Sequence, residues 1–184
     1  MIFVQDNFFA EKTFIALQKY AKNNPFNIQK AGKKEFSVLQ TPDDIIPILN
    51  INGHKLVFTF IRKAYKGFDN ELRIHADNII NGHKTALASV LYINENEGVT
   101  VNGTAFYRHK KYGNKLPEDV TDVEFDRIIR EDSNDPLKWE DEKDSISSRP
   151  NRRVLYDSNY FHSKFPNEIK EGERIVLVNF YAKE

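Results

Sequence analysis

The chain has 184 residues, of which 40% are hydrophobic and 12% aromatic, and its 27 basic residues balance 27 acidic ones. This length and apolar content predict a single folded domain over residues 1–184 and exclude a disordered chain. Cysteine is absent, which excludes disulfides and thiol chemistry and fits a reducing compartment.

Charge is unevenly distributed along the chain. Residues 117–150 hold twelve acidic and five basic side chains, so the remainder is basic by the same margin. The overall balance argues against a dedicated nucleic-acid partner. The opening "MIFVQDNFFAEK" does not resemble an export signal, and no apolar run reaches the roughly 20 residues that a membrane helix needs. We therefore expect a cytoplasmic protein with no membrane partner.

Two helices are expected near the start of the chain. Residues 8–24 place Ala10, Phe14, Leu17 and Ala21 at helical spacing, with charged residues between them. A second, short helix is expected over 43–50, after a capping threonine and a proline.

Most of the remaining chain has the composition of strands separated by glycine and asparagine turns. The expected strands are 55–65, 71–78, 85–94, 98–102, 104–110, 152–158 and 174–182. Short strands preceded by helices predict a mainly β fold, a sandwich or jelly roll with helical packing on one face.

The acidic segment 117–150 interrupts this pattern. It has a partial helical face and contains Trp139, the one tryptophan of the chain. We expect a short helix followed by a mobile segment. The segment is either a solvated surface insertion or a lid that contacts substrate, because long loops inside compact domains are often functional.

The stretch "ELRIHADN" places His75 and Asp77 on one face of a strand, because strand side chains alternate. A buried carboxylate beside an imidazole is costly unless something pairs with it, and a metal ion would be such a partner. His54, His83 and His109 lie in turn or basic contexts and are expected at the surface.

His162 differs from these three because aromatic residues surround it at the end of "RRVLYDSNYFHS". Arg174 opens an apolar strand, where burial of its guanidinium requires an anion. Taken separately, these residues are better explained as a local ion pair, a core histidine and a strand-edge arginine. Together, two histidines and a carboxylate suit a ferrous ion with open positions, and an arginine suits a carboxylate cosubstrate.

The chain resembles the 2-oxoglutarate- and iron(II)-dependent oxygenases, in particular their prolyl-4-hydroxylase-like branch. The resemblance covers nearly the whole chain and lies in five segments: "VQDNFFAEKTFIAL", "RIHADN", "TALASVLYIN", "NGTAFY" and "DSNYFHSKFP…GERIVLVNFY". It implies a double-stranded β-helix, or jelly-roll, core.

The resemblance also implies a set of site residues. Iron(II) would be bound by His75, Asp77 and His162, and the distal carboxylate of 2-oxoglutarate by Arg174 with the hydroxyl of Tyr92. Tyr65 lies ten residues before His75, where some relatives place a tyrosine that contacts the cosubstrate.

The implied reaction uses dioxygen to hydroxylate a C–H bond of a peptide or protein side chain, or of a small molecule, with succinate and CO2 as co-products. Related halogenases have a small residue in place of the carboxylate, so Asp77 implies hydroxylation. Arg73 is a candidate for contact with substrate, and Tyr107 and Arg108 are candidates for the mouth of the pocket.

Two other functions fit the same fold. One is a cupin-like metalloenzyme that uses the three ligands without 2-oxoglutarate. The other is a non-catalytic jelly-roll binding module, which would not need His75. The position of Arg174 distinguishes the first alternative from the oxygenase, since only a cosubstrate requires the guanidinium in the metal cavity.

Overall fold

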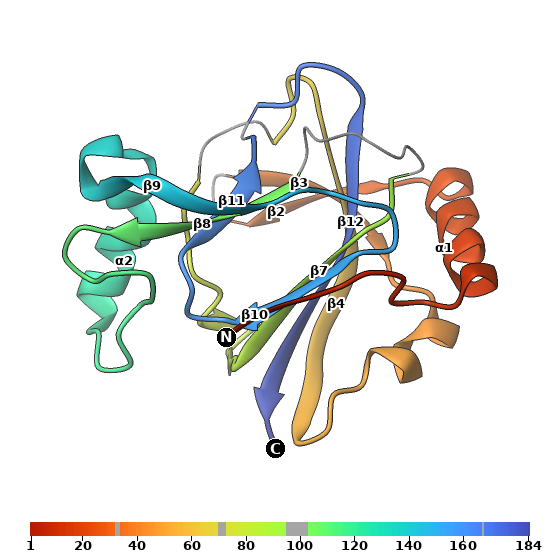
Figure 1. The fold of residues 1–184 in the computed structure, drawn as a ribbon, viewed down its shortest axis with the longest axis horizontal. Coiled ribbons are helices and arrows are strands. Elements are labelled where there is room, and N and C mark those ends of the chain that lie inside the picture. Colours follow the sequence, from red (N-terminus) through yellow and green to blue (C-terminus); the bar gives the residue numbers. More distant parts are fainter. Residues whose placement is uncertain (32–33, 70–72, 95–102, 167) are drawn as a thin grey trace.

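The computed structural model describes residues 1–31, 34–69, 73–94, 103–166 and 168–184 (Figure 1). Its main layer is an antiparallel seven-stranded sheet in the order β1-β10-β7-β12-β4-β3-β2. In that order the strands are β1 (Ile2–Gln5), β10 (Arg153–Asp157), β7 (Leu87–Tyr92), β12 (Glu173–Lys183), β4 (His54–Tyr65), β3 (Lys34–Gln40) and β2 (Asn27–Ala31).

A three-stranded sheet forms the second layer, in the order β11-β8-β9. Its strands are β11 (His162–Phe165), β8 (Gly103–His109) and β9 (Trp139–Ile146). A short hairpin, β5 (Ile79–Ile80) with β6 (His83–Lys84), lies between β4 and β7 in the chain. The mainly β, jelly-roll fold expected from the sequence is confirmed.

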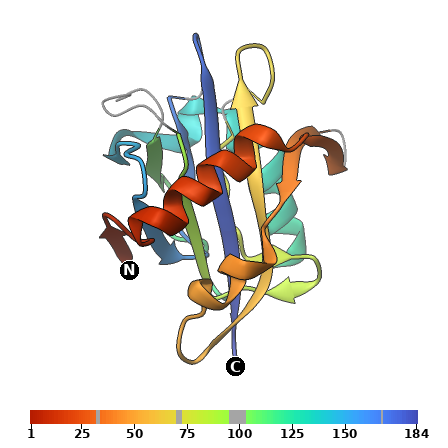
Figure 2. The same ribbon diagram turned by 90° about the vertical axis from the view of Figure 1, so that its right-hand side faces the viewer.

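The helix α1 (Glu11–Asn23) packs across the outer face of the main sheet, as Figure 2 shows. Phe14, Leu17 and Ala21 are buried there, as their spacing predicted. They pack with Leu39, Ile61, Leu91, Ile93 and Leu177 from the strands. The expected second helix is the 3-10 helix η1 (Asp43–Leu49), which contains Pro47.

The opposite face of the main sheet points toward the smaller sheet. Along β12, Val176, Val178 and Phe180 belong to this inner cluster, whereas Leu177 belongs to the outer one. Alternation along one strand therefore fills two cores, one under α1 and one between the sheets. The inner face also carries the cavity described below.

The acidic segment is structured, so the expected mobile part of 117–150 is wrong. After α2 (Asp122–Arg130) come two short 3-10 helices, η2 (Asp132–Asn134) and η3 (Pro136–Lys138), and then β9. β9 pairs with β8 and extends the smaller sheet. Its Trp139 is buried, and the indole Nε1 donates to the carbonyl of Asp132 at 2.7 Å.

His109 is also buried, which corrects the expectation that it lies at the surface. Its Nε2 lies 3.1 Å from the carboxylate of Asp132, which also accepts a hydrogen bond from Arg127 at 2.7 Å. A partner 23 residues away thus satisfies a histidine that lies in a basic local sequence.

The strand expected over 98–102 lies outside the described residues. β8 begins directly after it at Gly103, where a side chain is excluded because a Cβ would overlap the carbonyl of Ile146 on β9. No helix in the described part of the chain is both long and apolar enough to span a bilayer.

Candidate metal and cosubstrate site

Backbone pairing brings the two halves of the site together. The amide of His75 donates to the carbonyl of His162 at 3.0 Å, and the amide of His162 donates back at 2.9 Å. The amide of Asp77 donates to the carbonyl of Ser158 at 2.8 Å. Residues 75–77 therefore lie beside residues 158–162, which lead into β11, and this places residues far apart in sequence side by side.

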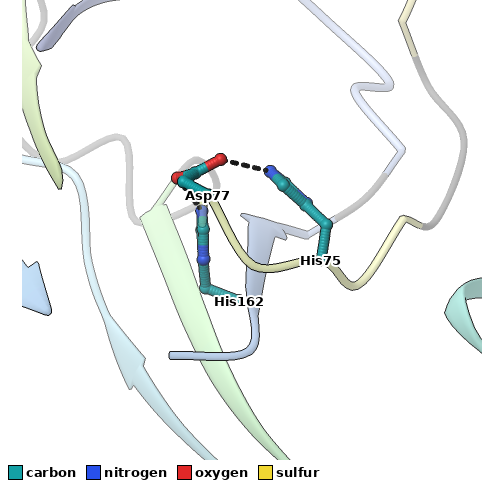
Figure 3. A group of neighbouring side chains, drawn as sticks. All are labelled: His75, Asp77 and His162. Carbon is teal, nitrogen blue, oxygen red and sulfur yellow. Dashed lines mark ion pairs between the residues drawn. The ribbon is translucent and has the colours of Figure 1, made fainter. Parts of the chain in front are cut away.

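Alternation then divides the side chains of this segment. Ile74 and Ala76 pack into the core of the smaller sheet, whereas His75 and Asp77 line a cavity on the other side. The shared face predicted for these two residues is therefore observed, and His162 lies on it with them (Figure 3).

The three side chains form a compact cluster. His75 Nε2 lies 3.5 Å from one oxygen of Asp77, and His162 Nε2 lies 3.2 Å from the other. One nitrogen or oxygen of each residue lies within 4.8 Å of the corresponding atoms of the other two. The carboxylate thus sits between two imidazole nitrogens that point toward it (Figure 3).

Both imidazoles are held in the same tautomer. Nδ1 of His75 lies 3.0 Å from the carbonyl of Arg73, and Nδ1 of His162 lies 2.9 Å from the carbonyl of Tyr160. A carbonyl can only accept, so each neutral ring carries its proton on Nδ1 and presents the lone pair of Nε2. This is the arrangement that orients metal-ligating histidines in proteins.

Electrostatics keep the donor set ready for a cation. Burial, followed by the charge of His162, lowers the pKa of His75 to about 3, so the ring is neutral at physiological pH. Burial acts to raise the pKa of Asp77, but His162, His75 and Arg73 outweigh it and the pKa lies below its usual value. A donor set of two imidazole nitrogens and one carboxylate fits a divalent transition metal such as iron(II).

Tyr156 on β10 borders this cluster, and sequence reasoning did not identify it. Its hydroxyl lies 3.0 Å from Nε2 of His162 and is buried. Burial raises the pKa of Tyr156 well above its usual value, so the phenol is a neutral donor. The one sequence signal was its position two residues after Val154, which places both side chains on the inner face of β10.

Arg174 lines the same cavity as the three-residue cluster. Its side chain is buried, and one terminal nitrogen donates a long hydrogen bond of 3.4 Å to the carbonyl of Gly103. Among the described residues, its Nε has no hydrogen-bond partner. A buried guanidinium with an unused donor is suited to an anion that enters the cavity.

Tyr92 lies behind this arginine. The guanidinium carbon of Arg174 is 5.8 Å from the ring centroid, and the Tyr92 hydroxyl is hydrogen-bonded to that of Thr104 at 2.8 Å. Thr104 lines the cavity, but Tyr92 is not among the lining residues that the structure describes. The hydroxyl that faces the cavity here is therefore that of Thr104, inside the "NGTAFY" segment.

Lys164 on β11 adds a second cation to this end of the cavity, and the sequence did not single it out. Burial lowers its pKa to about 8, although the carboxylate of Asp69 lies 3.9 Å away. Asp69 in turn accepts a hydrogen bond from Nε of Arg62 at 2.8 Å.

The cavity has a volume of about 980 Å³ and is lined by His75, Asp77, His162 and Arg174, the four residues that the family resemblance groups in one site. Tyr65 is elsewhere: it ends β4 and its ring stacks on Phe68 at 5.1 Å. No residue of 117–150 lies among the described residues that line the cavity, so the expectation of a lid is not supported.

Of the three candidates for contact with substrate or for the pocket mouth, only one lies in the cavity. Arg73 lines the cavity, two positions before His75 on the same side of its segment. Tyr107 is buried in the core of the smaller sheet, and Arg108 lies 4.0 Å from Glu140 on another surface. Only the first of the three is placed to contact a ligand in this cavity.

Solved structures share this fold at low sequence identity. HygX from Streptomyces hygroscopicus, with nickel and 2-oxoglutarate bound, is 11% identical, with a TM-score of 0.63, and the match covers 99% of this chain and 82% of HygX. The 2-oxoglutarate-dependent epimerase SnoN from nogalamycin biosynthesis is 11% identical, with a TM-score of 0.65 and coverage of 99% and 78%. A Pseudomonas putida prolyl-4-hydroxylase is 12% identical, with a TM-score of 0.54 and coverage of 100% and 92%.

These structures confirm the resemblance to the 2-oxoglutarate oxygenases at the level of the fold. No curated protein matches the sequence. The model of one sequence family, described as a family of unknown function, matches residues 72–174, a span that begins before His75 and ends at Arg174. The chain therefore belongs to this family of unknown function, DUF6445.

Proposed function

We propose that the protein is an iron(II)- and 2-oxoglutarate-dependent dioxygenase that hydroxylates a C–H bond of a peptide side chain or a small molecule. One observation carries the proposal. The His75, Asp77 and His162 cluster shares a cavity with a buried arginine that has an unused donor. A metal site alone or an anion site alone would suit many functions, whereas the combination suits a metal enzyme with an anionic cosubstrate.

The three-residue cluster would hold iron(II) through the two Nε2 atoms and the carboxylate of Asp77. Iron(II) bound there supplies the activation of dioxygen that couples conversion of 2-oxoglutarate to succinate and CO2 with oxidation of the substrate. The backbone carbonyls of Arg73 and Tyr160 keep both rings oriented before any ligand arrives.

Arg174 would bind the distal carboxylate of 2-oxoglutarate, using the donor that has no partner among the described residues. The hydroxyl of Thr104, held by Tyr92, and the cation of Lys164 lie at the same end of the cavity and would add donors. Tyr92 would therefore support the cosubstrate indirectly, through the hydrogen bond between its hydroxyl and that of Thr104 and through its ring beside the Arg174 guanidinium. The placement of Tyr65 does not support the cosubstrate role expected for it.

The position of Arg174 also favours this function over a cupin-like enzyme without 2-oxoglutarate. A cupin-like reaction would not need a buried guanidinium in the metal cavity, and a cation there would lower stability without benefit. The retained carboxylate of Asp77 supports hydroxylation. The epimerase SnoN shares the fold, so analysis of the product is needed to assign the reaction.

An anaerobic titration tests the proposal. Iron(II) and then 2-oxoglutarate are added to the metal-free protein, and the weak visible charge-transfer band of their complex is recorded. We expect the band in the wild type, its loss in His75→Ala, and a much higher 2-oxoglutarate requirement in Arg174→Ala. His83→Ala, which removes an exposed histidine on β6, is the matched control and should behave like the wild type.

Two results would contradict the proposal. Iron(II) binding without a band at saturating 2-oxoglutarate would favour the cupin-like enzyme. The same iron(II) affinity in wild type and His75→Ala would show that the cluster has a structural role.

A further inference from the structure

The cavity is much larger than 2-oxoglutarate requires, and its two ends differ in chemistry. Along β12, the residues that line it are Arg174, Val176, Val178 and Phe180, in that order. One end is therefore cationic and the other is aromatic. If the cosubstrate occupies the Arg174 end, the aromatic end remains for the molecule that is oxidised.

Three phenylalanines form this second end, which we call the aromatic ledge: Phe58 and Phe60 on β4, and Phe180 on β12. Antiparallel pairing places Phe58 directly opposite Phe180. The ring centroid of Phe58 lies 5.1 Å from that of Phe60 and 6.5 Å from that of Phe180. Phe58 and Phe60 are only partly buried, so their rings contribute surface to the cavity.

The β5–β6 hairpin supplies a second apolar wall. Ile79 and Ile80 both line the cavity, and Ile79 is 54% exposed. A large exposed aliphatic side chain beside partly exposed aromatic rings suits an apolar group placed between them.

Basic side chains outnumber carboxylates, six to three, among the described residues that line the cavity: Lys30, Lys34, Arg62, Arg73, Lys164 and Arg174 against Glu35, Asp69 and Asp77. A divalent metal and the dianion 2-oxoglutarate cancel each other, so their binding leaves this excess unchanged. Arg73 is the cation next to the metal cluster in sequence, and it faces the cavity on the same side as His75. A second anion would reduce the remaining charge.

We propose that the oxidised substrate is a small anionic molecule with an aromatic ring or an apolar group of similar size. The ring packs on the aromatic ledge and the anionic group lies toward Arg73. This inference rests on the proposed function for the reaction, but binding to the ledge can be measured without turnover.

Binding of simple probes tests the inference by ligand-observed NMR and calorimetry. The probes are 3-phenylpropionate, its neutral amide, phenethylamine, hexanoate and the neutral peptide acetyl-Ala-Pro-Gly-amide. Each is titrated into metal-free protein and into protein loaded with zinc(II) and 2-oxoglutarate, which does not turn over. We expect 3-phenylpropionate to bind at least about fivefold more tightly than each of the other four, since each of them lacks the ring, the anionic group or both, and ring packing and one ion pair each contribute about 1 kcal/mol.

Variants locate the binding site. Phe58→Ala should weaken binding of 3-phenylpropionate about fivefold, and Arg73→Gln should remove the preference for the acid over its amide. Phe3→Ala, an exposed phenylalanine on β1 outside the cavity, and Arg108→Gln are the matched controls and should leave affinity unchanged. Thermal unfolding of each variant shows whether it is folded, and Phe60→Leu replaces Phe58→Ala if the latter unfolds.

Three results would overturn the inference. These are equal affinity for 3-phenylpropionate and its amide, tighter binding of the amine or the peptide, and unchanged affinity in a folded variant of the aromatic ledge. Its failure is distinguishable from failure of the proposed function. If the probe binds as expected but the iron(II)–2-oxoglutarate band is absent, the ledge stands and the oxygenase does not. If the band forms but the probes show no preference, the reverse holds.

Discussion

Replacement of Arg174 by methionine should separate stability from cosubstrate binding. The guanidinium is buried, makes one long hydrogen bond of 3.4 Å, and has an Nε without a partner among the described residues. Methionine fills a similar volume without a charge to desolvate. Replacing buried charges by apolar residues of similar size is often neutral or stabilising by about 1–4 kcal/mol. We expect the variant, without ligands, to be at least as stable as the wild type.

The same substitution should nearly abolish affinity for 2-oxoglutarate. Truncating one member of a buried, hydrogen-bonded charge pair costs about 2–5 kcal/mol, which corresponds to a loss of roughly 30-fold to several thousand-fold. Urea unfolding measures the first effect, and calorimetry of the zinc(II)-loaded protein measures the second. 2-Oxoglutarate should consequently raise the unfolding temperature of the wild type but not of the variant.

Arg62→Met provides the matched control. Arg62 lines the same cavity but is paired with Asp69, its Nε donating at 2.8 Å, so its loss leaves a half-buried carboxylate without its main partner. This variant should be less stable than the wild type. If Arg174→Met is the less stable variant and still binds 2-oxoglutarate normally, the arginine is structural and the reasoning is refuted.

Three further predictions concern the structural support of the site. Asp132→Ala should lower the free energy of unfolding by about 1–3 kcal/mol, because it leaves the buried His109 and Arg127 without their shared carboxylate, while 2-oxoglutarate affinity stays unchanged. Urea unfolding measures the loss, and a loss below 1 kcal/mol would show that this buried cluster is not coupled to folding. Gly103→Ala should destabilise the protein and weaken 2-oxoglutarate binding, since the added methyl group would push the Ile146 carbonyl away and shift β8, whose Gly103 carbonyl contacts Arg174. A variant with wild-type stability and affinity would show that the sheet can relax there. Burial lowers the pKa of His109, because its effect outweighs that of Asp132. As the pH falls below about 6.5, the pKa of histidine in the unfolded state, the unfolded chain therefore takes up a proton on this imidazole before the folded protein does. The stability contributed by His109 is therefore lost as the pH falls, and His109→Asn should show a flatter profile between pH 7 and 5.

Part of the candidate site could be predicted from the sequence, for identifiable reasons. The two-residue period of a strand places His75 and Asp77 on one face. The burial of α1 follows equally well from the helical spacing of Phe14 and Leu17. His162 and Arg174 were candidates from their local sequence, but their place in the same site came from the family resemblance, because nothing in local spacing shows that strands so distant in sequence are neighbours.

What the sequence did not predict depends on register and on distant partners. Tyr156 and Thr104 lie on ordinary apolar strands, and only the register of β10 with β7 and of β8 with β11 brings their hydroxyls to the site. β9 was missed because its sequence "WEDEKDSI" is charged and mostly exposed, as suits an edge strand. His109 was misplaced because its partner Asp132 lies in the following acidic segment.

If the proposed function is right, one cavity holds iron(II) on His75, Asp77 and His162 and 2-oxoglutarate on Arg174. Anomalous diffraction at the iron edge, from crystals grown anaerobically with iron(II) and 2-oxoglutarate, tests it most directly. We expect one iron peak bounded by His75, Asp77 and His162, with a carboxylate of the cosubstrate on Arg174. An iron peak elsewhere, or a cosubstrate bound away from Arg174, would contradict it.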